Sequence, residues 1–168
     1  VCCGCYMLKT KEFFDIYPDR VIPEYPVGQN FQMLLPFMYR HKCPTIPQEL
    51  YGVAVRPGSH SRRALDQALE EKKYSDYERL VDDIAAICRI ADKASLDRLE
   101  CWKARRRYQI SMKYGRGQAA SQALRQLRRC GGLRNGETVR LLCEVYLMHS
   151  RVGRRLYPLY RKIRYGQP

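Results

Sequence analysis

Basic residues in the last two-fifths of the chain are the side chains best suited to chemistry with a partner. Residues 101–168 contain seventeen Lys and Arg against Glu137 and Glu144 alone, whereas residues 1–50 are neutral and residues 51–100 have a net charge of −1. A guanidinium group presents a planar fork of donors that matches phosphate oxygens. The candidate anion-binding residues are Lys103, Arg105, Arg106, Arg107, Arg125, Arg128, Arg129, Arg134, Arg151, Arg154, Arg155, Arg161, Lys162 and Arg164.

Tyrosines lie among these basic clusters, and their rings can stack on unpaired bases or on guanidinium planes. The candidate stacking residues are Tyr108, Tyr114, Tyr157 and Tyr160, and Tyr165 follows the last cluster. This mixture favours structured RNA as the partner. Two alternatives remain open: a solvated face that pairs with acidic protein neighbours, and an anionic lipid surface that meets the basic and apolar tail of residues 154–167.

Eight cysteines allow two interpretations. Cys2, Cys3 and Cys5 with His41 and Cys43 include enough thiol and imidazole groups for a zinc site, but the usual spaced pair of cysteines is missing. We therefore favour thiols that are buried as small apolar groups in a reducing compartment, and we expect no metal.

Signatures of catalysis are missing from the sequence. No glycine-rich phosphate loop follows an apolar strand, and no nucleophile elbow occurs. The carboxylates between Asp66 and Glu100 have the spacing of solvated helix faces. We expect a protein that is not an enzyme and that has no cofactor and no small-molecule substrate.

Proline divides the chain into an N-terminal arm and a helical domain. Seven of the nine prolines precede residue 58, so residues 1–58 are predicted to be an irregular, extended arm. The arm also contains many large apolar side chains, which need a surface to cover them. That surface belongs either to the chain's own helical domain, residues 59–168, or to a neighbouring subunit.

Helical periodicity begins at Ser59 and predicts four to five helices. Ser61 is expected to cap a short first helix, and Ser75 to Glu78 form a capping-box pattern that opens the next, with an apolar face of Tyr77, Leu80, Val81, Ile84, Ile87, Cys88 and Ala91. Further helices are expected from Leu96 to Tyr108, from Ala119 to Cys130 and from Asn135 to Val152. The glycines at 115, 117, 131 and 132 interrupt them, and Pro158 should end or kink the last. The fold class is mainly α, a small helical-hairpin domain behind a long Pro-rich arm.

The segment from Leu133 to Cys143, followed by Leu156-Tyr157 and Leu159-Tyr160, resembles one unit of the pentatricopeptide or octotricopeptide type of helical-hairpin repeat. The resemblance covers about residues 133–163. Many members of these families bind organellar RNA, so the resemblance implies a helical hairpin and an RNA partner. It assigns no base-reading residue.

These expectations combine into one hypothesis of function. We expect a non-catalytic subunit of a large mitochondrial assembly, most simply a ribosomal protein that contacts rRNA through its C-terminal helices and neighbouring subunits through its arm. The alternative is an accessory subunit of a respiratory-chain or ATP-synthase complex. Both place the protein in the mitochondrial matrix or on the matrix side of the inner membrane, and a chain that begins at Val1 fits either a processed mature form or a truncated sequence.

Overall fold

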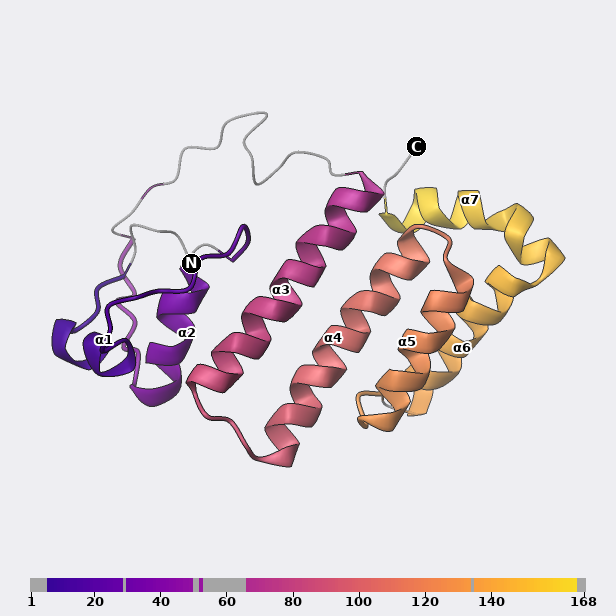
Figure 1. Cartoon of the computed structure of the whole chain (residues 1–168). Helices are drawn as coiled ribbons and strands as arrows, with labels where there is room; N and C mark the ends of the chain where they lie inside the picture. Colours follow the sequence, from indigo (N-terminus) through magenta and orange to yellow (C-terminus); the bar gives the residue numbers. More distant parts are fainter. Residues whose placement is uncertain (1–5, 29, 50–51, 53–65, 134, 166–168) are drawn as a thin grey trace. The chain divides into compact units, whose positions relative to one another are not determined.

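The computed structural model describes residues 6–28, 30–49, 52, 66–133 and 135–165 of the chain, without the side chains of Asn135, Arg161, Arg164 and Tyr165. The described residues form seven α-helices and no strand, which confirms the mainly α fold class; five of the helices lie in the predicted helical domain, as expected, and two lie in the predicted arm. The helices are α1 (Thr10–Ile16), α2 (Phe31–Arg40), α3 (Gln67–Ile87), α4 (Lys93–Lys113), α5 (Gly117–Arg129), α6 (Asn135–His149) and α7 (Arg151–Tyr165) (Figure 1).

The chain divides into two compact units, which we call unit 1 (Val1–Ile90) and unit 2 (Ala91–Pro168). Helix α3 therefore belongs with the N-terminal segment and not with the basic helices. The boundary between the compact units falls after residue 90 and not after residue 58. The predicted boundary itself lies in residues 53–65, outside the described part of the chain.

Unit 1 corrects the prediction of an irregular arm, because residues 10–16 and 31–40 are helical and pack with α3. Ile16 and Tyr17 from the α1 region and Phe37 from α2 form one buried cluster, against which Ile87 of α3 packs. Leu80, Ile84 and Cys88 form a second cluster with Tyr25, Phe31, Tyr77 and Ile90. The surface that covers much of the arm is thus the chain's own α3.

Helix α2 contains Pro36, a residue that helix interiors normally exclude. Proline lacks the N–H that would donate to the carbonyl of Gln32, four residues earlier. The hydroxyl of Tyr17 donates to that carbonyl instead. Because a side chain from the α1 region satisfies the orphaned oxygen, α2 continues to Arg40.

Helix α3 begins earlier than the capping-box pattern predicts. The carboxylate of Asp66 accepts a hydrogen bond from the Leu69 N–H at 2.8 Å and caps the helix, which then runs through Ser75 without a break. The predicted apolar face is confirmed at Leu80, Ile84 and Cys88, all of which are buried. The predicted cap at Ser61 lies outside the described residues.

Unit 2 is built on the α4–α5 hairpin, whose turn at residues 114–116 falls where the glycines predict it. Gly115 adopts a φ of +71° and Gly131, which follows α5, a φ of +68°, so the left-handed conformation ends both helices. Small and large apolar side chains alternate in the core. They are Ala104, Tyr108, Met112, Ala120, Ala123, Leu124, Leu127, Leu141, Val145 and Met148.

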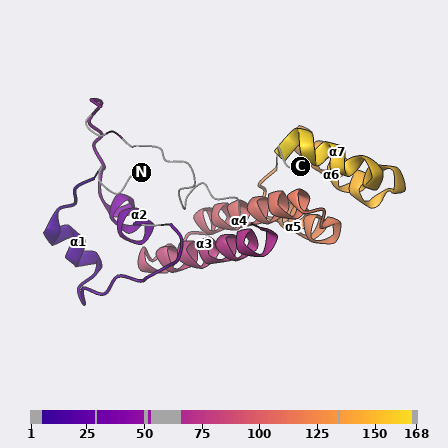
Figure 2. The ribbon, with the colours of Figure 1, turned by 90° about the horizontal axis from the view of Figure 1, so that it is seen from above.

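Helices α6 and α7 lie together on one side of the α4–α5 hairpin (Figure 2). The sequence predicted one helix from Asn135 to Val152, but the chain turns at Ser150. The Ser150 hydroxyl accepts a hydrogen bond from the Gly153 N–H at 2.8 Å and so caps α7. Any Cβ at Gly153 would collide with the Leu147 carbonyl, so the corner requires glycine. Of the two predicted effects of Pro158, ending the helix is contradicted, because α7 continues to Tyr165.

Candidate nucleic-acid interface

Three arginines of α5 form the clearest basic face of unit 2. Residues 120, 123, 124 and 127 of α5 are buried in the core, and Arg125, Arg128 and Arg129 are exposed. Helical periodicity separates the exposed arginines from the buried residues, because the arginines lie on the sides of the helix away from the buried stripe. The hairpin therefore holds three guanidinium groups in water on one short helix.

Helix α4 adds two exposed arginines, one of which reaches α5. The Nη1 atom of Arg107 lies 3.4 Å from the Gln126 side-chain oxygen, so this guanidinium reaches across to α5. The Nη1 atom of Arg106 lies 3.3 Å from the side-chain oxygen of Gln109, on its own helix. We use the name arginine face for the set Arg106, Arg107, Arg125, Arg128 and Arg129.

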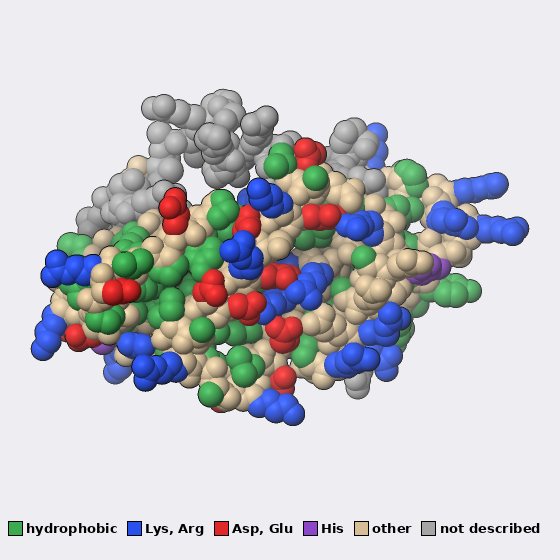
Figure 3. All heavy atoms as spheres, in the orientation of Figure 1, with side chains coloured by type: hydrophobic (Ala, Val, Ile, Leu, Met, Phe, Trp, Pro, Cys, Tyr) green, Lys and Arg blue, Asp and Glu red, His purple; other side chains and the backbone are tan. Residues whose placement is uncertain are grey.

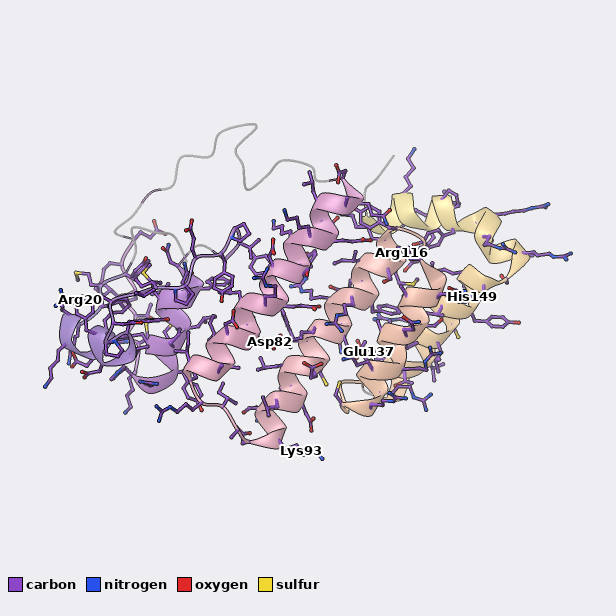
Figure 4. All side chains as sticks on the ribbon, viewed as in Figure 1. Arg20, Asp82, Lys93, Arg116, Glu137 and His149 are labelled. Atoms are coloured by element: carbon purple, nitrogen blue, oxygen red, sulfur yellow. The ribbon has the colours of Figure 1, made fainter. Side chains whose placement is uncertain are left out.

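The two carboxylates of residues 101–168 are both engaged within unit 2. Glu137, labelled in Figure 4, forms an ion pair with Arg105 of α4. Glu144 accepts a hydrogen bond from the Tyr108 hydroxyl at 3.0 Å and lies 3.9 Å from Nε of Arg140. Neither carboxylate pairs with an arginine of α5. On the visible part of α5–α7 in Figure 3, Lys and Arg side chains project into solvent without red carboxylates among them.

Lys103 and Arg105 were predicted to bind anions, but the structure engages both side chains within unit 2. Lys103 is only 5% exposed, and its ammonium lies 2.8 Å from a carboxylate oxygen of Glu100. Arg105 binds Glu137 and also donates to the Gly132 carbonyl at 2.7 Å, and the hydrogen bond to Glu137 raises the pKa of the guanidinium. Both side chains hold unit 2 together and do not form part of the arginine face.

The predicted stacking role of Tyr108 is wrong. Its ring is 4% exposed in the core and its hydroxyl donates to Glu144, so no base can reach either ring face. Tyr157 and Tyr160 stack on each other, with ring centroids 5.8 Å apart, and pack against the core while staying partly accessible. Tyr114 is half-buried at the end of α4, with the Lys113 ammonium 5.2 Å from its ring centroid.

Helix α7 carries the remaining described basic candidates. Arg151, Arg154, Arg155 and Lys162 are exposed. Arg134 lies outside the described residues, as do the side chains of Arg161, Arg164 and Tyr165. The structure thus brings Arg107 of α4 to α5, where Arg125, Arg128 and Arg129 lie, and places the candidates of α7 on a separate helix.

Two glutamines of α5 were missed by the sequence reasoning. Gln118 and Gln122 are exposed and precede Arg125 and Arg129 at spacings of four, three and four residues, which places all four on one stripe. A helical projection of residues 117–129 reveals this stripe from the sequence. Amide side chains both donate and accept, so they add groups able to contact sugars and base edges beside the exposed arginines.

The cysteines divide between buried and exposed sites. Cys88 is buried, and burial raises the pKa of its thiol. The Cys101 thiol donates to the Cys130 carbonyl at 2.9 Å, and burial raises the pKa of Cys101 to about 11. Cys43 and Cys143 are exposed, so the expectation of burial is wrong for these two. Cys2, Cys3 and Cys5 are not among the described residues, and the described residues contain no cluster of three His, Cys, Asp or Glu suited to a metal ion.

Within the described part of the chain, no helix is long and apolar enough to span a bilayer. No protein-family model matches the sequence, and no curated protein or solved structure matches it either.

Proposed function

We propose that this protein is a non-catalytic, RNA-binding subunit of a ribonucleoprotein, and that the arginine face contacts structured RNA. The assembly we propose is a mitochondrial ribosome or a similar organellar particle, in which neighbouring proteins contact other surfaces of the chain. The observation that carries the proposal is the exposure of Arg125, Arg128 and Arg129 together on one helix, α5.

Charge and donor geometry support RNA phosphate as the ligand. Exposed guanidinium groups bind phosphate oxygens in a bidentate manner, and each neutralised phosphate releases condensed counterions. The arginine face consists of guanidinium groups with amides beside them, a set that binds and positions a polyanion. The proposal therefore assigns the protein a structural task and no reaction.

A salt titration with the purified chain tests the proposal. We expect binding to a structured RNA hairpin to weaken steeply with salt. The triple variant Arg125→Gln, Arg128→Gln, Arg129→Gln should lower the slope of log K against log salt by about 2 to 3, since each lost phosphate contact removes roughly 0.7 to 0.9. The matched control is Lys72→Gln, Arg79→Gln, Arg98→Gln, which removes the same charge from α3 and α4.

Two outcomes would overturn the proposal. One is affinity that stays constant between low and moderate salt, because phosphate contacts require counterion release. The other is an equal loss of slope in the control variant, which would assign the binding to net charge alone and not to the arginine face.

Sedimentation of the tagged protein tests the assembly. We expect the protein to co-migrate with rRNA in a gradient of cell lysate and to leave that position after ribonuclease treatment. Migration with a membrane complex that is insensitive to ribonuclease would support an accessory subunit of a respiratory-chain or ATP-synthase complex and overturn the ribosomal assignment.

A further inference from the structure

Helix α7 exposes a stripe of large apolar side chains along its length. Val152, Leu156, Leu159 and Ile163 are 67%, 57%, 58% and 79% exposed. Their spacings of four, three and four residues place them on one face of the helix. We call these four residues the α7 stripe.

The protein itself covers a different face of α7. Gly153 is buried against the end of α6, and Tyr157 and Tyr160 pack on the core of unit 2. At 3.6 residues per turn, the α7 stripe lies between this covered face and a basic flank formed by Arg151, Arg155 and Lys162. The fold therefore leaves the α7 stripe exposed to solvent.

The charge of α7 restricts what can cover the stripe. Residues 151–165 contain six Lys and Arg and no Asp or Glu. RNA would neutralise the charge but leave the leucines in water. A second copy of α7 would bring the same six positive charges against them. The occupant must combine an apolar interior with an anionic surface.

We propose that α7 docks on an anionic membrane surface, with the α7 stripe inserted among acyl chains and the basic flank at the level of the lipid headgroups. Long Arg and Lys stems let the charged groups reach the headgroups while the helix lies in the interface. A lipid leaflet presents anionic groups at every position, so it matches a basic flank without a fixed register. An acidic protein groove would need carboxylates at matched positions. The proposal is independent of the RNA contact, which uses α4 and α5.

Vesicle co-sedimentation of the full chain tests the proposal. The probes are phosphatidylcholine vesicles with and without cardiolipin. We expect Leu156→Ser with Leu159→Ser to lower the partition coefficient on cardiolipin vesicles by about a hundredfold, since two inserted leucines are removed. The matched control, Ile46→Ser with Leu69→Ser, alters two residues that are 62% and 50% exposed outside α7 and should bind as the parent does.

A second variant tests the basic flank in the same vesicle assay. Arg151→Gln, Arg155→Gln, Lys162→Gln should lower binding to cardiolipin vesicles by about a hundredfold and leave the weak binding to pure phosphatidylcholine unchanged. Its control is Lys42→Gln, Lys72→Gln, Lys93→Gln, three exposed basic residues outside α7. Circular dichroism of every variant checks that the helices are retained.

Three results would overturn the proposal. The first is parental vesicle binding by the leucine variant, which would make any binding a matter of charge alone. The second is a loss of affinity for the RNA hairpin in the leucine variant with vesicle binding intact. The third is a dimer in sedimentation velocity that the leucine variant abolishes, which would assign the α7 stripe to a second copy.

Discussion

The two units differ most in how they use charge. Unit 1 has twelve Lys and Arg and twelve Asp and Glu, whereas unit 2 has nineteen against five, so the whole net charge of +14 belongs to unit 2. Unit 1 has small clusters rich in aromatic residues, and unit 2 has a continuous core of Ala, Leu and Met beneath its arginines. The compact unit with the larger core is therefore also the one that carries the uncompensated positive charge.

The largest expected effect tests whether the two units are separate folding units. Leu127 of unit 2 and Leu80 of unit 1 are both fully buried, so Leu127→Ala and Leu80→Ala should each cost about 3 kcal/mol. Trp102, the single tryptophan, lies in unit 2. In urea, Leu127→Ala should lower the midpoint of the tryptophan fluorescence transition. Leu80→Ala should leave that midpoint unchanged and should shift only the part of the circular dichroism transition that comes from unit 1. Equal shifts of the fluorescence midpoint would show that the chain unfolds as one unit.

A smaller effect is expected from a substitution of Gly28 in unit 1. Gly28 has a φ of +63° and a Cβ there would collide with Leu80, so Gly28→Ala should destabilise unit 1 by about 1 to 3 kcal/mol. The control is Gly136→Ala on α6, where a Cβ meets nothing within 4 Å. Thermal unfolding should show a loss for Gly28→Ala and a slight gain for the control. A neutral Gly28→Ala would contradict the close packing of this loop on α3.

The smallest expected effect is a pH dependence confined to unit 1. Burial and the hydrogen bond from the Tyr25 hydroxyl to Asp83 raise the pKa of Tyr25 from 10.0 to about 12. Since the folded pKa is the higher one, its stabilising contribution is complete below pH 10 and declines as the pH rises toward 12. Tyr25→Phe should remove this alkaline decline. The difference in tyrosinate absorbance between parent and variant should titrate with a pKa near 12. A pKa near 10 would contradict the hydrogen bond.

Local signals in the sequence predicted unit 2 better than unit 1. Gly115 and Gly131 end helices in the left-handed conformation, which a local sequence signal can predict, so the predicted α4–α5 hairpin is correct within a few residues. Helix α2 was missed because its continuation through Pro36 depends on Tyr17, a partner that no local pattern reveals.

The sequence predicted the basic character of the candidate interface but not all of the residues that belong to it. Arg125, Arg128 and Arg129 were found because charge is visible in the sequence. Lys103 and Tyr108 were wrongly included because their burial depends on packing between helices. Charge density alone does not separate residues that face solvent from residues that anchor a core.

The hydrogen bond from Tyr17 to the Gln32 carbonyl links the formation of two helices that lie far apart in the sequence. A peptide of residues 31–40 alone lacks the donor that replaces the missing proline N–H, so the Gln32 carbonyl in the first turn of the helix is left to solvent. We therefore expect α2 to be less stable when the α1 region that supplies Tyr17 is removed.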